Sequence, residues 1–161
     1  MAKTQDSIKV RGFFRIQITE GKGKKEKVVG DSGWCKNQVV NLGFQDYLCK
    51  GLAGASGKTI THIALGTGGA PAATDTSLAG EIMSSTQRKT ASTSIISSKT
   101  LQFTAQFASS DSFLTGASNL SNVALFNTTS TNATMFAGNT YTSSSCNTNQ
   151  NVNVTYQIRF S

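Results

Sequence analysis

The chain opens on a regular alternation between apolar and polar side chains. Over residues 8–19 the apolar positions that share one face are Ile8, Val10, Phe14, Ile16 and Ile18. A period of two residues is typical of a β-strand that buries one face. The glycine- and lysine-rich segment 20–27 then reverses the chain, and a return strand from Val28 can run to Trp34. Residues 8–34 are therefore predicted to form an N-terminal β-hairpin with a charged tip.

The same rhythm returns in the second half of the chain. Residues 101–107 and 152–160 alternate cleanly, and shorter apolar runs occupy 60–65, 121–126 and 135–137. About half of the residues from 100 to 161 are Ser, Thr or Asn, which suit the outer face of a sheet whose inner face is apolar. We expect a mainly β fold, an antiparallel β-sandwich of about seven or eight strands.

The period changes over residues 37–50, where apolar side chains recur at helical spacing. The recurring positions are Val40, Phe44, Tyr47 and Leu48. Asn37 is suited to cap the start of a helix, and Gly51 is suited to end it. The pattern predicts one substantial α-helix over residues 37–50, packed against an edge or end of the sandwich. A further helical turn is expected over residues 77–82.

Length and composition favour one domain. The 161 residues, 37% of them apolar, suit a single unit 1–161, with 8–34 as its hairpin and 35–161 as its sandwich. The sequence contains neither a run long enough for a membrane span nor an apolar signal-peptide core at its start, so we expect a soluble protein with no membrane partner. Three widely spaced cysteines, Cys35, Cys49 and Cys146, are expected to be small, partly buried thiols.

Positive charge is concentrated near the N-terminus. The formal net charge is +7, and residues 1–58 carry eleven Lys or Arg against five Asp or Glu. The surplus gathers at the hairpin tip, in Lys22, Lys24, Lys25 and Lys27. Such a cluster attracts nucleic acid or an acidic protein surface, and a solvated hairpin tip explains it equally well. Nucleic acid is the less favoured partner, because no aromatic side chains interleave with the lysines as stacking platforms.

No motif points to catalysis, a metal or a cofactor. His62 is the only histidine, it lies in an apolar run, and no nucleophile motif accompanies it. Asp75 and Glu81 share one segment, but capping of a turn is a simpler role than paired acid–base chemistry. Residues 57–59 resemble the end of a phosphate-binding loop, but Leu52 stands where that loop needs glycine. We therefore expect a protein that is not an enzyme and uses no cofactor.

Several blocks of the chain resemble a known family. They are Asn37–Gly43, Ile63–Gly68, Ala70–Glu81, Asn119–Asn127, Thr134–Tyr141 and Asn151–Phe160. These blocks include the patterns GTGxAP, DTxLxxE, LFN and VTYxIxF. Together they resemble bacteriophage virion structural proteins, of the tail-fibre-associated and head-surface kinds, over residues 35–161. Ala124 and Ala133 depart from the family, which has glycine at both places.

The resemblance implies a structural role in a virion and no catalytic residues to carry over. A short chain without a stalk is better sized for a capsid-surface or decoration subunit, or a tail subunit, than for a long fibre. We expect homo-oligomers that contact other virion proteins, in particles assembled in a host cytoplasm. The hairpin 8–34 is the candidate docking element, with the candidate residues Lys22, Lys24, Lys25, Lys27, Phe13 and Trp34.

An alternative function is a carbohydrate-binding adhesin module of a virion fibre. Aromatic side chains would then stack on sugar rings in a shallow groove. The candidates are Trp34, Tyr47, Tyr141 and Tyr156. Tyr156 is in phase with the predicted core face, which counts against it.

Overall fold

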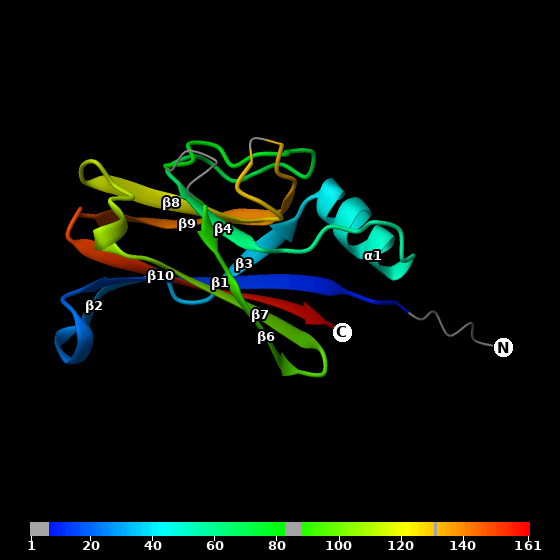
Figure 1. The fold of residues 1–161 in the computed structure, drawn as a ribbon, viewed down its shortest axis with the longest axis horizontal. Helices are drawn as coiled ribbons and strands as arrows, with labels where there is room; N and C mark the ends of the chain where they lie inside the picture. The colour runs from blue at the N-terminus through cyan, green and yellow to red at the C-terminus, as the bar shows by residue number, and fades with distance from the viewer. Residues whose placement is uncertain (1–6, 83–87, 131) are drawn as a thin grey trace.

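The structure is a computed structural model that describes residues 7–82, 88–130 and 132–161 (Figure 1). The strands are β1 (Val10–Glu20), β2 (Lys27–Asp31), β3 (Cys35–Val39), β4 (His62–Gly66), β5 (Lys89–Thr90), β6 (Ser92–Ser97), β7 (Thr100–Phe107), β8 (Ser118–Phe126), β9 (Met135–Cys146) and β10 (Gln150–Phe160). The helical segments are η1 (Gly23–Lys25), the π-helical η2 (Gly43–Cys49), which continues into α1 (Lys50–Leu52), and η4 (Ser109–Asp111).

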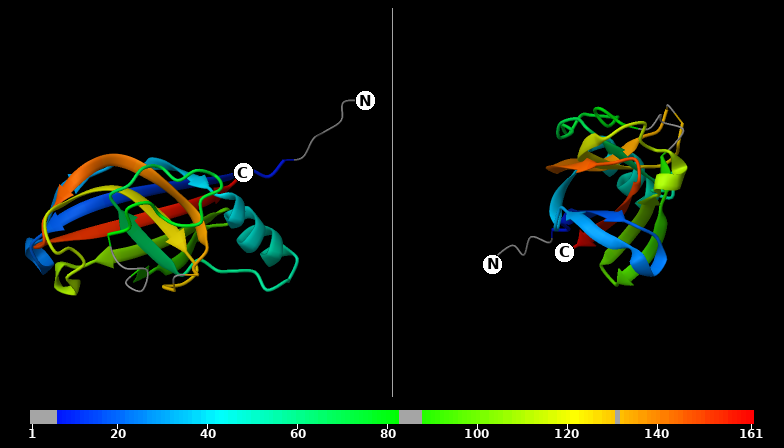
Figure 2. Two further views of the ribbon diagram at one scale, coloured as in Figure 1. Left: turned by 90° about the horizontal axis from the view of Figure 1, so that it is seen from above. Right: turned by 90° about the vertical axis from the view of Figure 1, so that its left-hand side faces the viewer.

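The described strands form an antiparallel sheet that folds into two layers. One layer runs β2/β1/β10/β7/β6, and the other runs β9/β8/β4/β5. The layers join at two corners. At the first, β3 pairs with β1 through residues 35–37 and with β9 through residues 38–39. At the second, β5 pairs with β4, and the chain continues directly into β6, which pairs with β7. The result is nearly barrel-shaped, as the end view in Figure 2 shows.

The expected fold class is confirmed: the protein is mainly β, antiparallel, with one short helix. The described residues form ten strands, compared with the seven or eight expected. β1 and β2 form the expected N-terminal hairpin, and β1 also pairs with β10 along its whole length. β1 is therefore a central strand of the sheet, whereas β2 forms an edge beside it.

The core lies between the two layers and follows the alternation read from the sequence. The inward faces of β1 and β10 bury Phe14, Ile16 and Ile18 opposite Tyr156, Val154 and Val152. The rings of Phe14 and Tyr156 stack with centroids 5.7 Å apart. Burial raises the pKa of Tyr156 well above its usual range. Its hydroxyl is buried without a hydrogen-bond partner among the described residues.

The helix begins later than predicted, and the capping role of Asn37 is wrong. Asn37 lies within β3, beside Gly12 of β1, and the helical segments span Gly43–Cys49 and Lys50–Leu52. The residues before them are extended because Val39 pairs with β9 and the amide of Val40 donates to the carbonyl of Phe136. Gly43 allows the helix to lie against β9, since a Cβ there would stand 2.1 Å from the Phe136 oxygen.

The helical turn expected over residues 77–82 is also wrong. The chain makes a tight turn at Ala79 and Gly80, where Gly80 adopts φ +63°. The amide of Ile82 then donates to the carbonyl of Leu65, so the segment returns alongside β4. A left-handed residue ends helical geometry, which explains why a helical turn does not form.

Candidate assembly surfaces

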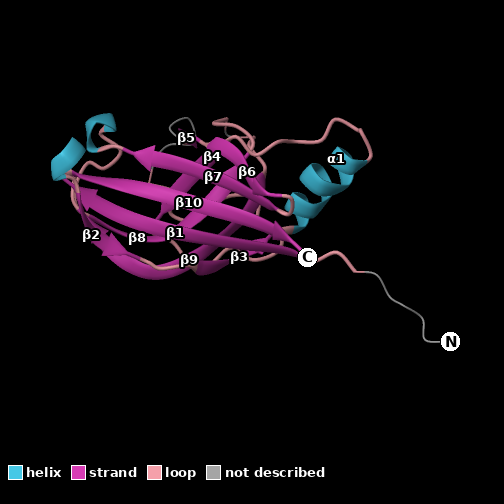
Figure 3. Ribbon diagram, turned by 90° about the horizontal axis from the view of Figure 1, so that it is seen from below, coloured by secondary structure: helices cyan, strands magenta, loops and turns pink. Residues whose placement is uncertain are grey.

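The lysine cluster forms one exposed surface at the tip of the β1–β2 hairpin. Lys22, Lys24, Lys25 and Lys27 are all exposed, on and beside η1. Gly21 reverses the chain with φ +96°, and a Cβ there would meet the Lys25 oxygen at 2.6 Å. None of the four ammonium groups forms a salt bridge within the described residues. Their charge therefore faces solvent at one end of the molecule, opposite α1 (Figure 3).

Polar contacts hold β2 and the tip against β1. The guanidinium of Arg15 donates to Asp31 with Nε–Oδ1 at 2.9 Å, and the amide of Gln17 donates to the same carboxylate at 3.1 Å. The hydrogen bonds and the charge of Arg15 hold the pKa of Asp31 well below its usual range. At the tip, Thr19 donates to Glu26 at 2.5 Å. The hairpin thus presents its lysines from an anchored base.

The structure does not bring the other two candidate residues to the lysine tip. Phe13 precedes Glu20 by seven residues along β1, a separation of about 23 Å in an extended strand. Its ring is half-buried, with the Arg159 guanidinium 4.5 Å above the ring centroid. Trp34 lies in the turn between β2 and β3 and is 48% exposed. Trp34 is therefore exposed to solvent away from the lysine tip, and Phe13 packs on the surface of the sheet beneath Arg159.

A second surface, which the sequence did not indicate, is the edge of the sheet at β6. Every residue of this strand is exposed, including Ile95 at 75% and Ile96 at 50%. Strand pairing connects Ile95 to Leu101, Leu101 to Ile158, and Ile158 to Gly12. Ile95 therefore lies level with the start of β1. The lysine tip follows the other end of β1, about 27 Å away from Gly12 along that strand.

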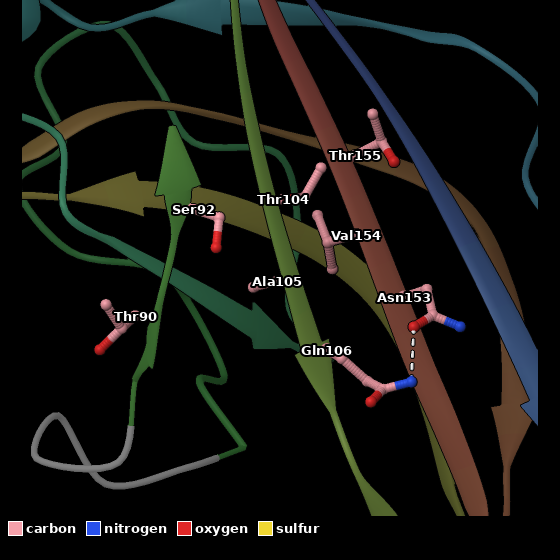
Figure 4. A pocket seen from close by; sticks show the side chains of 8 residues that line it. All are labelled: Thr90, Ser92, Thr104, Ala105, Gln106, Asn153, Val154 and Thr155. Carbon is pink, nitrogen blue, oxygen red and sulfur yellow. Dashed lines mark hydrogen bonds between the residues drawn. The ribbon is translucent and has the colours of Figure 1, made fainter. Parts of the chain in front are cut away.

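Two of the hollows on the surface involve β7 and β10. The first, of about 380 Å³, is lined by Thr90, Ser92, Thr104, Ala105, Gln106, Asn153, Val154 and Thr155 (Figure 4). It is rich in hydroxyl and amide groups, and Gln106 of β7 donates to the neighbouring Asn153 of β10 at 3.0 Å. The second, of about 420 Å³, is mainly apolar and lies where the helix meets β7 and β10, with Tyr47, Leu101 and Phe160 in its wall.

The residues weighed for catalysis do not come together. His62 is half-buried with its Nδ1 2.7 Å from the Thr61 hydroxyl, and burial, with the charge of Arg88 as a smaller cause, lowers the pKa of His62. Asp75 accepts a hydrogen bond from the amide of Ala72 at 2.8 Å, while Glu81 pairs with Arg88. No group of three or more potential metal ligands occurs among the described residues.

The three thiols differ in exposure. All are free: Cys35 is half-buried, Cys146 is buried, and Cys49 is exposed. Burial raises the pKa of Cys146 to about 11. The expectation of partly buried thiols is therefore confirmed for Cys35 alone, because Cys49 is exposed at the end of η2 and Cys146 is fully buried in the core.

The DTxLxxE block has a structural role in which an arginine, missed by the sequence analysis, is central. Arg88 is almost fully buried and donates to Glu81 at 2.9 Å and 3.1 Å. It also donates to the carbonyls of Thr128 and Ser130 at 3.1 Å and 3.2 Å. Its guanidinium lies 3.7 Å above the centroid of the Phe126 ring. No periodic pattern surrounds Arg88, so only the fold reveals these partners.

The GTGxAP block is also structural. The loop after β4 covers the outer face of β8, where the fully buried Asn122 donates to the carbonyls of Gly69 and Ala79 at 3.1 Å and 2.9 Å. Gly68 lies so close to Ala79 that a Cβ would stand 2.3 Å from its oxygen. The glycines of the block therefore permit close packing of the loop.

Comparison with known proteins adds no relative to this picture: no family model, curated protein or solved structure matches the chain. Among the described residues, no helix has both the length and the apolar character needed to cross a membrane.

Proposed function

We propose that the chain is a structural subunit of a phage-like virion that docks through the lysine tip onto an acidic surface of the particle. The main support is the tip itself, where four exposed ammonium groups form no salt bridge with a carboxylate of the described residues. Although Glu20 and Glu26 lie in the same turn, the four lysines give the tip a net positive charge, and a positive patch on an anchored hairpin suits electrostatic docking to an acidic surface. The likeness of residues 35–161 to virion structural proteins supports the particle as the place of docking.

The packing of the resembling blocks also supports a structural role. Glu81 and Asn122 lie in two of those blocks, and each is occupied in internal contacts. Neither is presented to solvent in a way that suits a substrate. The blocks then form a stable body, and the exposed surfaces around it are left to supply the contacts.

Localisation in particles is the first test. An antibody raised against the chain is applied to gradient-purified virus particles from a culture or sample that contains the gene, and its binding is followed by immunogold electron microscopy. The proposal expects the chain to band with the particles and the gold to decorate their surface. A chain that never bands with particles would refute the virion role.

The lysine tip is tested separately, by rebinding to particles from which the subunit has been stripped. The variant carries serine at Lys22, Lys24, Lys25 and Lys27, and the control carries serine at the exposed Lys9, Lys36 and Lys99. We expect the tip variant alone to lose binding, and the binding of the unmodified chain to fall as salt rises. Equal binding by both variants would show that docking uses another surface.

The carbohydrate-binding alternative has weaker support. Tyr47, Tyr141 and Tyr156 are all buried, which leaves Trp34 as the exposed ring of the four candidates. The hydroxyl-rich hollow of Figure 4 offers hydrogen bonds to a sugar, but its lining contains no aromatic side chain. A glycan array probed with the chain and with Trp34→Ala tests this alternative, and binding lost in the variant would favour it.

A further inference from the structure

The edge of the sheet at β6 is open along its full length. β6 pairs with β7 on one side, and no described strand lies on the other. An open edge presents unpaired backbone N–H and C=O groups, which pair readily with another strand. All six of its residues are exposed, so nothing in the described chain covers the edge.

Two other strands at the edges of the sheet, β2 and β5, are protected by charge or by shortness. β2 begins with Lys27 and adjoins the lysine tip, so pairing two copies through β2 would bring like charges together. β5 is only two residues long, and its Lys89 is bound to Asp111 at 2.8 Å. β6 contains neither charge nor proline, and its two isoleucines are exposed. Its one irregularity is the shift of register between Ile95 and Ser97.

We propose that β6 pairs with β6 of a second copy of this chain, antiparallel and about a two-fold axis at Ile95. In an antiparallel pair, residues that oppose each other point to the same face of the sheet. A two-fold axis perpendicular to the sheet at Ile95 therefore sets Ile95 against its own copy on the inner face. Each copy has one layer that ends in β6, and the two copies of this layer would become one continuous sheet across the dimer.

Charge favours a second copy as the occupant. Residues 92–97 are neutral and identical in both copies, so self-pairing at this edge meets no like-charge opposition within the strand. An isologous contact needs a self-complementary surface, and a short neutral strand with an isoleucine on the axis meets that need. A foreign partner selected by charge would find no charge to read on β6.

The expected contact is weak in solution. Six residues per strand make an interface smaller than the ~800 Å² per partner of a standard complex. Many weak contacts become effective when copies are held near one another on a particle. The inference rests on the proposed function in this sense, because it names the self-contact of the proposed assembly. The dimer itself forms without a particle, so the two can be tested apart.

Cysteine cross-linking tests the register. Ile95→Cys is made in a Cys49→Ser background, which removes the exposed native thiol. The matched control is Val29→Cys in the same background, since Val29 is 52% exposed on β2. Under mild oxidation at high protein concentration, we expect a disulfide dimer at least about tenfold faster for Ile95→Cys, because its two thiols meet on the axis. Equal rates for the two variants would overturn the proposal.

Sedimentation equilibrium over a range of concentrations tests the edge without a cross-link. Ile95→Lys places two like charges opposite each other and should remove the concentration-dependent increase in mass that the unmodified chain shows. Val28→Lys, on β2, should leave that increase unchanged. Because both positions are more than half exposed, both variants are expected to fold. An unmodified chain that stays monomeric at every concentration would overturn the proposal.

The outcomes separate this inference from the virion role. A chain that dimerises through β6 but never bands with particles contradicts only the virion role. A chain that bands with particles, but whose Ile95→Cys variant does not cross-link to itself in solution or on the particle, contradicts only the β6 pairing. Cross-linking of that variant to a different virion protein, and not to itself, would identify a foreign strand as the occupant and would also overturn the proposal.

Discussion

Removing Arg88 tests whether the DTxLxxE block is structural. Arg88→Met deletes four hydrogen bonds and the contact with the Phe126 ring, and leaves the carboxylate of Glu81 largely buried. The side chains of Arg88 and Glu81 are only 4% and 13% exposed, so solvent screens their charges weakly. Breaking a buried pair of this kind costs about 3–5 kcal/mol. Since domains are stable by only about 5–15 kcal/mol, the variant should be severely destabilised.

A double-mutant cycle separates the ion pair from its surroundings. Glu81→Gln keeps an oxygen that accepts a hydrogen bond from Arg88, and the two backbone carbonyls still accept from the guanidinium. We therefore expect a smaller loss of unfolding free energy, about 1–3 kcal/mol. The double variant buries no unpaired charge. It should therefore be more stable than the sum of the single losses predicts, by about 1–2 kcal/mol.

Urea unfolding at neutral pH measures all three variants. Lys89→Met is the control, because Lys89 is the next residue along and its ion pair with Asp111 is more exposed. A surface pair contributes about 0–1 kcal/mol, so the control should unfold near the unmodified midpoint. The reasoning is refuted if Arg88→Met loses less than about 1 kcal/mol or if the single losses simply add. A Glu81→Gln variant of full stability that no longer bands with particles would instead assign Glu81 to a contact.

Three further predictions concern the core, the helix and the pH dependence of the hairpin. Tyr156→Phe should stabilise the fold by about 1 kcal/mol, because it removes a buried hydroxyl without a described partner; a loss of stability in urea unfolding would mean that the hydroxyl is bonded. Gly43→Ala should cost about 1–3 kcal/mol by forcing the helix from β9. Gly51→Ala, where a Cβ meets nothing within 4 Å, should gain about 0.5–1 kcal/mol; equal effects of the two substitutions on the urea midpoint would contradict this. The pKa of Asp31 is lowered in the folded protein, so its contact with Arg15 should stabilise the fold fully above pH 3.8, and this stabilisation should be lost as the pH falls further. Asp31→Asn should therefore make the melting temperature depend less on pH in that acidic range.

The sequence predicted those strands that bury one complete face. β1 and β10 alternate apolar and polar residues over most of their lengths, with Phe13 as the exception in β1, and their observed bounds lie close to the expected ones. β6 escaped prediction because all its residues are exposed, so no buried face imposes a period of two on it. β3 escaped because its five residues divide their pairing between β1 and β9, and its inward face includes the polar Asn37.

The candidate surfaces were predictable to the extent that they depend on local sequence. The lysine tip was predictable because four lysines within six residues must lie close together. The separation of Phe13 from that tip depends on the length of β1, and the role of Arg88 depends on contacts with β8 and the loop after it. The open edge at β6 depends on the order of strands in the sheet, which alternation within one strand does not reveal.

Salt should affect the two proposed contacts differently. At physiological salt the Debye length is about 8 Å, so the lysine tip, about 27 Å away along β1 from the level of Ile95, contributes little repulsion to pairing at β6. The chain can then carry a net charge of +7 and still self-associate at a neutral edge. Docking of the tip to an acidic surface should weaken as salt rises, because its energy is mainly coulombic. Pairing of neutral strands through backbone hydrogen bonds and isoleucine burial should not weaken. Parallel titrations with sodium chloride of particle binding and of the Ile95→Cys cross-link would therefore distinguish a subunit with two separate contacts from one that uses charge for both.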